Sequence, residues 1–282
     1  MNAPPGAEAI KPYHGLRVAL ATQHGKEAAI AAPMAELTGL ILVVTPDVDT
    51  DSLGTFTGEI PRPAPMRETA RMKAVLGMKA SGLARGIASE GSFGPHPAIP
   101  FLPAARELMI FLDKTRGIEI AEEQIAVNTN FAALDLTPDT DLEGFLANAG
   151  FPEHALIFRS GERLVKGITS REVLDGLLRD ASSAVRLETD MRAHLNPTRM
   201  AEIAKLAEKL ARRIATACPS CGAPGFGLVR TELGLPCADC GTATGLVRTV
   251  VSGCRLCGHE DRGPRNDGRF TANPSECQEC NP

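Results

Sequence analysis

Apolar residues in the first part of the chain fall into short runs and helical stripes. Leu16–Thr22 and Leu40–Thr45 are apolar runs with branched residues, which is the pattern of buried strands. Lys26–Leu37, between them, has a helical pattern that Pro33 limits or kinks. Because strands joined through a helix are usually parallel neighbours, the chain is expected to open with a β-α-β unit of a mixed α/β fold.

Regular elements are expected to continue to about residue 216. Pro65 opens a predicted helix that ends at Gly82, and a strand, Leu83–Ser89, follows it. The next segment, Phe93–Pro103, contains four prolines and is predicted to be a stiff loop. Further strands are predicted at Leu108–Leu112, within Gly117–Val127 and at Ala155–Arg159, and further helices at Asp141–Ala149 and Ser170–Arg179.

A long amphipathic helix is predicted to close this part of the chain. Asn196 suits its N-cap, and Pro197 suits its first turn. Apolar residues recur at intervals of three and four and form one stripe. They are Met200, Ile203, Ala207, Leu210 and Ile214. We expect this helix to pack on the first domain and to lead the chain into its C-terminal segment.

All eight cysteines lie in the last 65 residues, as four C-x-x-C pairs. Each pair can form a tight knuckle that aims both sulfurs at one tetrahedral ion, so four pairs predict two structural zinc sites. Four disulfides would instead need an oxidising compartment, and residues 1–14 lack the apolar core of a secretory signal, so we expect a cytoplasmic protein. The predicted ligands are Cys218, Cys221, Cys237, Cys240, Cys254, Cys257, Cys277 and Cys280.

The spacing leaves the pairing of the four knuckles open. In a nested scheme, which we favour, Cys237 to His259 forms one complete ribbon around a short hairpin containing Val247 and Val250, and the outer knuckles close the second site. In a sequential scheme, the first knuckle joins the second and the third joins the fourth. His259 could replace a thiol, but eight cysteines already complete two sites, so a surface role is expected.

Composition predicts three parts: a disordered tail at residues 1–14, an α/β domain with a mixed sheet at 15–216, and a small β zinc-ribbon module at 217–282.

From Cys218 onward the chain has six arginines, no lysine and seven acidic residues. Nucleic acid requires a cationic surface and is not an expected partner. The longest apolar run, Leu40–Val44, is too short to cross a bilayer, so no membrane association is expected.

Residues 46–65 form a polar, proline-rich excursion. Asp47, Asp49 and Asp51 alternate as in a calcium loop, but the glycine and the glutamate that such a loop has at its sixth and twelfth positions are missing. We expect a solvated active-site or surface loop.

Charged residues stand near the ends of predicted strands. Lys26 follows Gly25 at a helix start, where free N–H groups attract phosphate, and Thr22 would add a hydroxyl. Glu90 follows an apolar strand, where α/β sheets bind ligands, and Glu68 lies in the first turn of a helix. The two carboxylates could share a Mg2+ ion and position water. Without a binding role, Lys26 would be an ordinary exposed lysine, and Glu68 would be a carboxylate that the helix dipole favours in a first turn.

Three short segments resemble, in their order, motifs of the inosine-triphosphatase-like house-cleaning nucleoside triphosphate pyrophosphatases. They read Thr22-Gln-His-Gly-Lys26, Glu68-Thr-Ala-Arg-Met-Lys73-Ala74 and Ala88-Ser-Glu90-Gly-Ser92. The resemblance implies Mg2+-dependent cleavage between the α and β phosphates in a cleft of an elongated α/β fold. It also implies that Lys26 holds phosphate, while Glu68 and Glu90 bind metal and activate water.

A fourth segment, His194-Leu-Asn196-Pro-Thr-Arg199, stands where that group often has a Ser-His-Arg motif that contacts the base. The resemblance makes His194 and Arg199 the candidates here. Arg192 is not explained by capping either, and with them it could face the cleft and neutralise phosphate charge. One acid of the group's strand-end pair is replaced by Ser89, and the zinc module is foreign to the group. Over its whole length, the chain resembles a bacterial family of unknown function.

Two functions fit these observations. In the first, the α/β domain is a Mg2+-dependent hydrolase of a nucleotide or related phosphoanhydride, and the zinc module is structural or docks a partner. In the second, the domain binds a phosphorylated ligand without catalysis, and the ribbons contact a protein or RNA partner. In either, the chain could form a homodimer. The predicted catalytic residues are Glu68 and Glu90, and the predicted phosphate- and substrate-binding residues are Thr22, Lys26, Lys73, Ser92, Arg192, His194 and Arg199.

Overall fold

The computed structural model describes residues 11–45, 48–54 and 60–282 and divides into two compact units. The N-terminal unit is Tyr13–Ala211, and the C-terminal unit contains Arg212–Pro282 with the described residues up to Pro12. Asp47, one of the aspartates of the predicted polar excursion, lies outside the described residues.

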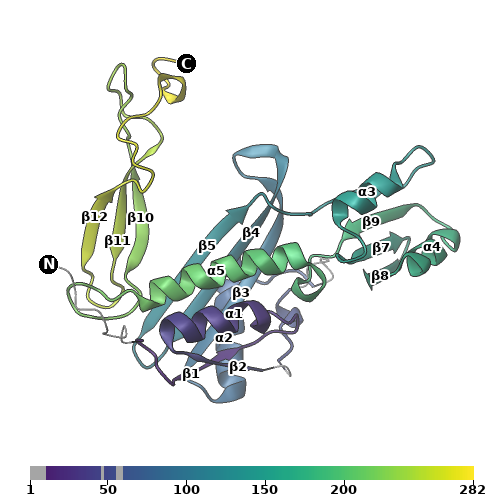
Figure 1. The fold of residues 1–282 in the computed structure, drawn as a ribbon, viewed down its shortest axis with the longest axis horizontal. Coiled ribbons are helices and arrows are strands. Elements are labelled where there is room, and N and C mark those ends of the chain that lie inside the picture. The colour runs from purple at the N-terminus through teal and green to yellow at the C-terminus, as the bar shows by residue number, and fades with distance from the viewer. Residues whose placement is uncertain (1–10, 46–47, 55–59) are drawn as a thin grey trace. The chain divides into compact units, whose positions relative to one another are not determined.

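The N-terminal unit contains a mixed five-stranded sheet of order β2-β1-β3-β4-β5 (Figure 1). β1 (Arg17–Leu20) pairs in parallel with β2 (Ile41–Val44) and with β3 (Arg85–His96). β4 (Ile99–Asp113) and β5 (Ile118–Ala126) extend the sheet with antiparallel pairing. The predicted α/β class and its mixed sheet are therefore confirmed.

The chain between β1 and β2 is helical. α1 (Glu27–Pro33) ends at its proline, and a π-helical turn (Met34–Thr38) follows. Proline has no N–H to donate and crowds the preceding turn, which explains why the regular α-helix ends at Pro33, the residue predicted to limit or kink it. Gly39, with a φ of 78°, then reverses the chain into β2, because glycine adopts the left-handed conformation at little cost.

The proline-rich segment Phe93–Pro103 is not the loop that its composition predicts. It forms the outer part of the long β3–β4 hairpin, in which Pro95 lies opposite Pro103 (Figure 1). Residue pairs of an antiparallel ladder alternate between those that exchange N–H bonds and those that do not, so two opposed prolines fit a pair of the second kind. The prediction was wrong because the strand register, and not the number of prolines, decides whether a ladder bond is lost.

α5 (Pro197–Ala215) is the predicted amphipathic helix. The Asn196 side chain accepts a hydrogen bond of 2.9 Å from the Arg199 backbone N–H, so Asn196 is the N-cap, as predicted. A 3-10 turn, Ala193–Leu195, precedes it. The fully buried residues of the predicted stripe are Ile203, Ala207, Leu210 and Ile214. Neither α5 nor any other helix in the described part of the chain has the length and apolar character needed to cross a membrane.

Different helices cover the two faces of the five-stranded sheet. Leu108 and Ile110 of β4 belong to an apolar cluster with residues of α2 (Met66–Ser81). The neighbouring Glu107 instead contacts Arg199 of α5. Because alternate residues of a strand point to opposite faces, α2 and α5 lie on opposite sides of the sheet.

A second, four-stranded sheet of the N-terminal unit has the order β6-β9-β7-β8. Its strands and the helices that pack with it are β6 (Ala133–Asp135), α3 (Leu142–Ala149), β7 (Leu156–Ser160), β8 (Arg163–Ile168), α4 (Arg171–Arg179) and β9 (Val185–Thr189). Phe158, Leu174 and Leu187 lie in their shared core. The pattern of apolar residues predicted α3, β7 and α4, whereas it did not indicate the other three strands.

The C-terminal unit is built on a three-stranded antiparallel sheet. β11 (Val247–Gly253) lies between β10 (Gly227–Leu233) and β12 (Glu260–Pro264). The nested scheme predicted a complete hairpin between Cys237 and His259. That segment instead contributes the single strand β11, whose partners come from outside the segment's knuckles.

Tyr13 is the first fully buried residue of the described chain. Its ring packs edge-on against that of Phe111, with centroids 5.2 Å apart. The composition of residues 1–14 predicted a disordered tail that includes Tyr13, but its burial makes Tyr13 part of the folded N-terminal unit.

Candidate functional sites

A cavity of about 130 Å³ lies beside the carboxyl end of β1. β1 pairs with β3 only as far as Leu20 and Ile87, so β3 continues alone along this edge and brings residues 89–91 to the cavity. One water molecule needs about 10–15 Å³, so the cavity has room for several waters or for a small polar ligand.

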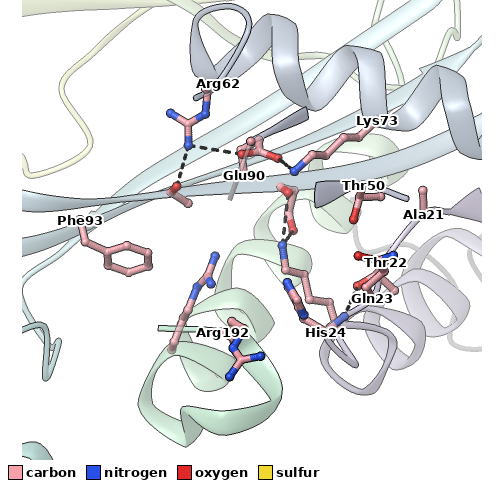
Figure 2. Close-up of a pocket in the computed structure, with 15 residues that line it drawn as sticks. Ala21, Thr22, Gln23, His24, Thr50, Arg62, Lys73, Glu90, Phe93 and Arg192 are labelled. Atoms are coloured by element: carbon pink, nitrogen blue, oxygen red, sulfur yellow. Dashed lines mark hydrogen bonds and ion pairs between the residues drawn. The ribbon is translucent and has the colours of Figure 1, made fainter. Parts of the chain in front are cut away.

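Cations dominate the cavity wall. The basic residues that line it are Lys26, Arg62, Lys73, Arg192 and Arg199. Among the described lining residues, Glu90 is the one carboxylate. Figure 2 shows Arg62, Glu90 and Lys73 together on one side of the cavity, with His24 and Arg192 on the other. The electrostatic potential inside should therefore attract anions.

The Lys26 side chain is anchored on β3. Its Nζ lies 3.1 Å from Oγ of Ser89 and 3.3 Å from the carbonyl oxygen of the same residue. The pKa of Lys26 is lowered to about 8, first by burial and then by the charge of Arg199, while Glu107 and Glu90 partly oppose the shift. The amine therefore loses its proton far more readily than an exposed lysine does.

The Glu90 carboxylate is held between two cations (Figure 2). Nη2 of Arg62 lies 3.3 Å from Oε2 of Glu90 and donates to the carbonyl oxygen of Gly91 at 2.9 Å. The Lys73 amine pairs with Oε1 of Glu90. The Glu90 and Lys73 side chains are 8% and 11% exposed, so this pair is largely removed from water. The Glu90 carboxylate is thus already paired with two cations of the protein.

Two further carboxylates lie behind the arginines. Nε of Arg199 donates to Oε1 of Glu107 at 2.7 Å, and Nη2 of Arg192 donates to Oδ2 of Asp190 at 2.7 Å. Both carboxylates are completely buried. Gly91 permits this packing, because a Cβ there would lie 2.7 Å from Oε1 of Glu107. The two guanidinium groups are thus fixed in place before any ligand binds.

Aromatic rings border the cavity. The Arg199 guanidinium carbon lies 4.9 Å from the centroid of Phe93, a lining residue. His24 also lines the cavity, and its ring stacks on that of His194 with centroids 5.3 Å apart and an angle of 20°. Burial, and then the charge of Arg192, lower the pKa of His194, which favours its neutral form. The stack connects the loop after β1 to the turn before α5.

The cavity contains six of the nine predicted site residues outside the cysteines. They are Thr22, Lys26, Lys73, Glu90, Arg192 and Arg199. Glu68, Ser92 and His194 are not among the described residues that line it. Ser92 is exposed on β3, and His194 reaches the cavity wall only through its stack with His24.

Glu68 has a different environment from Glu90. Its side chain is 53% exposed, and Oε1 lies 3.8 Å from the Arg71 guanidinium. Arg71 in turn pairs with Glu119 of β5 at 3.0 Å. Because only Glu90 of the two predicted catalytic carboxylates lines the cavity, a Mg2+ ion shared by Glu68 and Glu90 has no support in this arrangement.

Sequence reasoning did not single out Arg62, Thr50, Ser89 and Phe93 as site residues. Arg62 and Thr50 belong to the polar excursion, and both line the cavity, as an active-site loop would. No motif marks them individually. For Ser89, the available signal was its position directly before Glu90 at the end of an apolar run.

The cysteines form two groups of four in the C-terminal unit. One group is Cys218, Cys221, Cys254 and Cys257, and the other is Cys237, Cys240, Cys277 and Cys280. The sulfurs of each group lie within 4.8 Å of one another, and the contacts between knuckles measure 3.6–3.8 Å. A disulfide bond is only about 2.05 Å long. Four sulfurs about 2.3 Å from a tetrahedral zinc ion would be about 3.8 Å apart, so each group could hold a metal ion.

The knuckles are interleaved, so both the nested and the sequential scheme are wrong. The first knuckle joins the third, and the second joins the fourth. Gly227 of β10 lies opposite Gly253 of β11, and Leu233 lies opposite Val247. Each antiparallel strand reverses the chain, so successive knuckles fall at alternate ends of the sheet. The first and third knuckles therefore meet at one end, and β12 returns the chain to the other end, where the second and fourth meet.

A repeat in the sequence marks this arrangement. Gly227-Leu-Val-Arg-Thr231 and Gly245-Leu-Val-Arg-Thr249 are identical, and each stands between two successive knuckles. Two equivalent strands in these positions indicate a strand before the second knuckle as well as after it. That signal separates the interleaved scheme from the nested one, which has a complete hairpin after the second knuckle.

Comparison with known proteins identifies a family without an assigned activity. The domain of unknown function DUF6671 matches residues 73–282. No curated protein and no solved structure matches the chain. The family match covers both cysteine groups and seven of the fifteen described residues that line the cavity, whereas Thr22, Lys26 and Arg62 precede the matched segment.

Proposed function

The chain belongs to the DUF6671 family, and we propose that its N-terminal unit binds a phosphate-bearing small molecule in the cationic cavity. The observation that carries this proposal is that Lys26, Arg62, Lys73, Arg192 and Arg199 all line one cavity, in which Glu90 is the single carboxylate among the described lining residues. Those cations come from four separate segments of the chain.

Phosphate suits this cationic cavity better than a singly charged anion does. Guanidinium groups bind phosphate oxygens through paired hydrogen bonds, and lysine adds a compact point charge. Asp190 and Glu107 orient Arg192 and Arg199, and so lower the cost of arranging the site when the ligand binds. Phe93 and His24 provide flat surfaces beside the charges, where the remainder of the ligand can pack.

Binding is proposed to occur without Mg2+. A metal site needs carboxylates that are free to coordinate, and Glu90 is paired with both Lys73 and Arg62. The ligand phosphate would share these two cations with Glu90. Hydrolysis assisted by Mg2+ on Glu68 and Glu90 therefore remains a prediction from the family resemblance, without a supporting contact.

Zinc is the proposed metal for the two cysteine groups. Tetrahedral coordination by four thiolates is characteristic of structural zinc, and the sulfur spacing agrees with it. The C-terminal unit has small strands and buries one thiol of each knuckle, so much of its stability would come from the metal. Zinc would thus hold the fold and would not act on a substrate.

Calorimetric titration of the full chain with sodium pyrophosphate tests the phosphate proposal. We expect binding in buffer freed of divalent cations, and a loss of affinity of about tenfold or more in Arg192→Met, because each charged hydrogen bond contributes about 1.5–3 kcal/mol. Arg67→Met is the matched control, since Arg67 pairs with Glu119 of β5 and is not among the described residues that line the cavity. Absence of binding by pyrophosphate and inorganic phosphate at millimolar concentration, or binding that requires Mg2+, would contradict the proposal.

A further inference from the structure

A hydroxyl and an amine face each other in the cavity, apart from the carboxylates that the sequence analysis singled out. Oγ of Ser89 lies 3.1 Å from Nζ of Lys26, within the range in which a base can remove a proton from a nucleophile. Both residues line the cavity, and Ser89 is 5% exposed. No other hydrogen bond of the Ser89 hydroxyl occurs among the described residues.

The surroundings of Lys26 suit a base. The pKa of about 8 results first from burial, then from Arg199 of α5, with Lys73 of α2 acting in the same direction. Glu107 of β4 and Glu90 of β3 act in the opposite direction. About a tenth of the amine is then neutral at pH 7, whereas a lysine with an ordinary pKa of about 10.4 is almost entirely protonated.

We propose that Ser89 is a nucleophile and Lys26 its general base, and that the cavity transfers a phosphoryl group from a phosphate ester or anhydride to Ser89. This inference rests on the proposed binding of phosphate in the same cavity. Arg62, Arg192 and Arg199 would hold the non-bridging oxygens and stabilise their charge during transfer, as cationic clamps do in other phosphoryl-transfer sites.

The step balances with groups that are present. The neutral Lys26 amine takes the hydroxyl proton, the Oγ–P bond forms, and the bond from phosphorus to the leaving oxygen breaks. The Lys26 ammonium then gives its proton to that leaving oxygen. In the second half, Lys26 removes a proton from water, water attacks phosphorus, the P–Oγ bond breaks, and Ser89 regains its proton as inorganic phosphate leaves. The net co-reactant is water, and no metal is required.

Two neighbouring hydroxyls provide internal comparisons. Ser92 lies three residues further along β3, but it is exposed and does not line the cavity. Thr22 lines the cavity, but its hydroxyl accepts a hydrogen bond from the His24 backbone N–H at 3.3 Å. Ser89 differs from both because an amine contacts its oxygen directly.

The test uses acetyl phosphate, a small anionic phosphoryl donor, on the full chain. A competition titration first identifies the concentration at which acetyl phosphate displaces sulfate, and mass spectrometry of rapidly quenched protein then locates any phosphate. We expect phosphoserine at residue 89, formed faster as the pH rises and Lys26 loses its proton. Ser89→Ala should abolish the adduct while the sulfate affinity stays within about twofold of the original, and Ser92→Ala should change neither.

The Lys26→Arg variant tests whether Lys26 acts as a base or only as a positive charge. Arginine preserves the charge that binds sulfate but cannot accept a proton at neutral pH, so adduct formation should fall about 100-fold or more while sulfate still binds. Sulfate displacement without phosphate on Ser89, or equal labelling in Lys26→Arg, overturns this inference and leaves the proposed phosphate binding intact. Failure of sulfate and pyrophosphate to bind at all overturns both.

Discussion

Arg199 and Glu107 form a buried ion pair of 2.7 Å between residues 92 positions apart in the sequence. The Glu107 side chain is inaccessible to solvent, and that of Arg199 is 7% exposed. The Arg199 guanidinium also donates to the carbonyl oxygen of Met191. The pair joins the first turn of α5 to the middle of β4, and it places a positive charge at the cavity.

Replacing one member of this pair should destabilise the N-terminal unit strongly. Arg199→Met leaves the Glu107 carboxylate buried without its partner, and such losses cost about 3–5 kcal/mol. The double variant Arg199→Met with Glu107→Leu removes both charges and should recover much of that loss. Urea denaturation followed by circular dichroism would measure both. A double variant no more stable than the single variant would show that the buried charge is not the cause.

Glu90→Gln should strengthen pyrophosphate binding. The substitution removes the carboxylate that shares Lys73 and Arg62 with the ligand, and one unit of charge at this range corresponds to an affinity gain of about tenfold. Titration calorimetry without Mg2+ would measure the change. Glu68→Gln is the control and should have no effect, because Glu68 does not line the cavity among the described residues. Weaker binding in both variants, together with a Mg2+ requirement, would favour the shared metal that the family resemblance implies.

Sulfate binding should weaken above pH 8. Sulfate keeps its charge throughout the neutral and alkaline range, so any pH dependence of its affinity comes from titration of the protein. The free Lys26 amine has a pKa of about 8, and a bound anion would raise that pKa, so binding is coupled to a proton. Affinity should be level below about pH 7 and should fall about tenfold per pH unit above 8, until the raised pKa is passed. Lys26→Arg should remove the decline, and a decline of the same size in this variant would assign it to another group.

Pairs of cysteine substitutions should show whether the two interleaved cysteine groups each hold one zinc ion, as proposed. Cys221→Ser with Cys257→Ser damages one group and leaves the other complete, so one equivalent of zinc should remain of the two expected. Cys221→Ser with Cys240→Ser damages both groups and should retain less. Elemental analysis of protein purified without chelators would count the metal. One equivalent in the 221/240 variant would indicate sequential pairing, and one equivalent in a 221/280 variant would indicate nested pairing.

Removal of the metal should unfold the C-terminal unit selectively. A strong chelator would release the thiolates, and the small sheet of β10, β11 and β12 has little apolar core to replace them. Amide hydrogen exchange should then become fast in β11 and remain slow in β4. Protection of β11 that is unchanged in metal-free protein would show that the sheet does not depend on zinc.

Amino-acid order alone determined the local features of this protein. The apolar runs predicted β1, β2 and the α/β class, and Asn196-Pro197 predicted the start of α5. The C-x-x-C spacing identified all eight members of the two cysteine groups that could hold metal ions. Each of these features depends on neighbours within a few positions, where backbone preference and side-chain reach decide the outcome.

Tertiary structure decided which distant groups meet. Glu68 and Glu90 both suit a metal site by residue type. In the fold, however, Glu68 lies near Arg71 on the same helix, α2, whereas Glu90 forms an ion pair with Lys73 of α2. The Ser89–Lys26 contact exists because β3 continues beyond the end of β1. Strand register likewise paired the cysteine knuckles and accommodated opposed prolines in the β3–β4 hairpin. Contacts of this kind depend on strand register and on the lengths of neighbouring strands, which residue spacing alone does not specify.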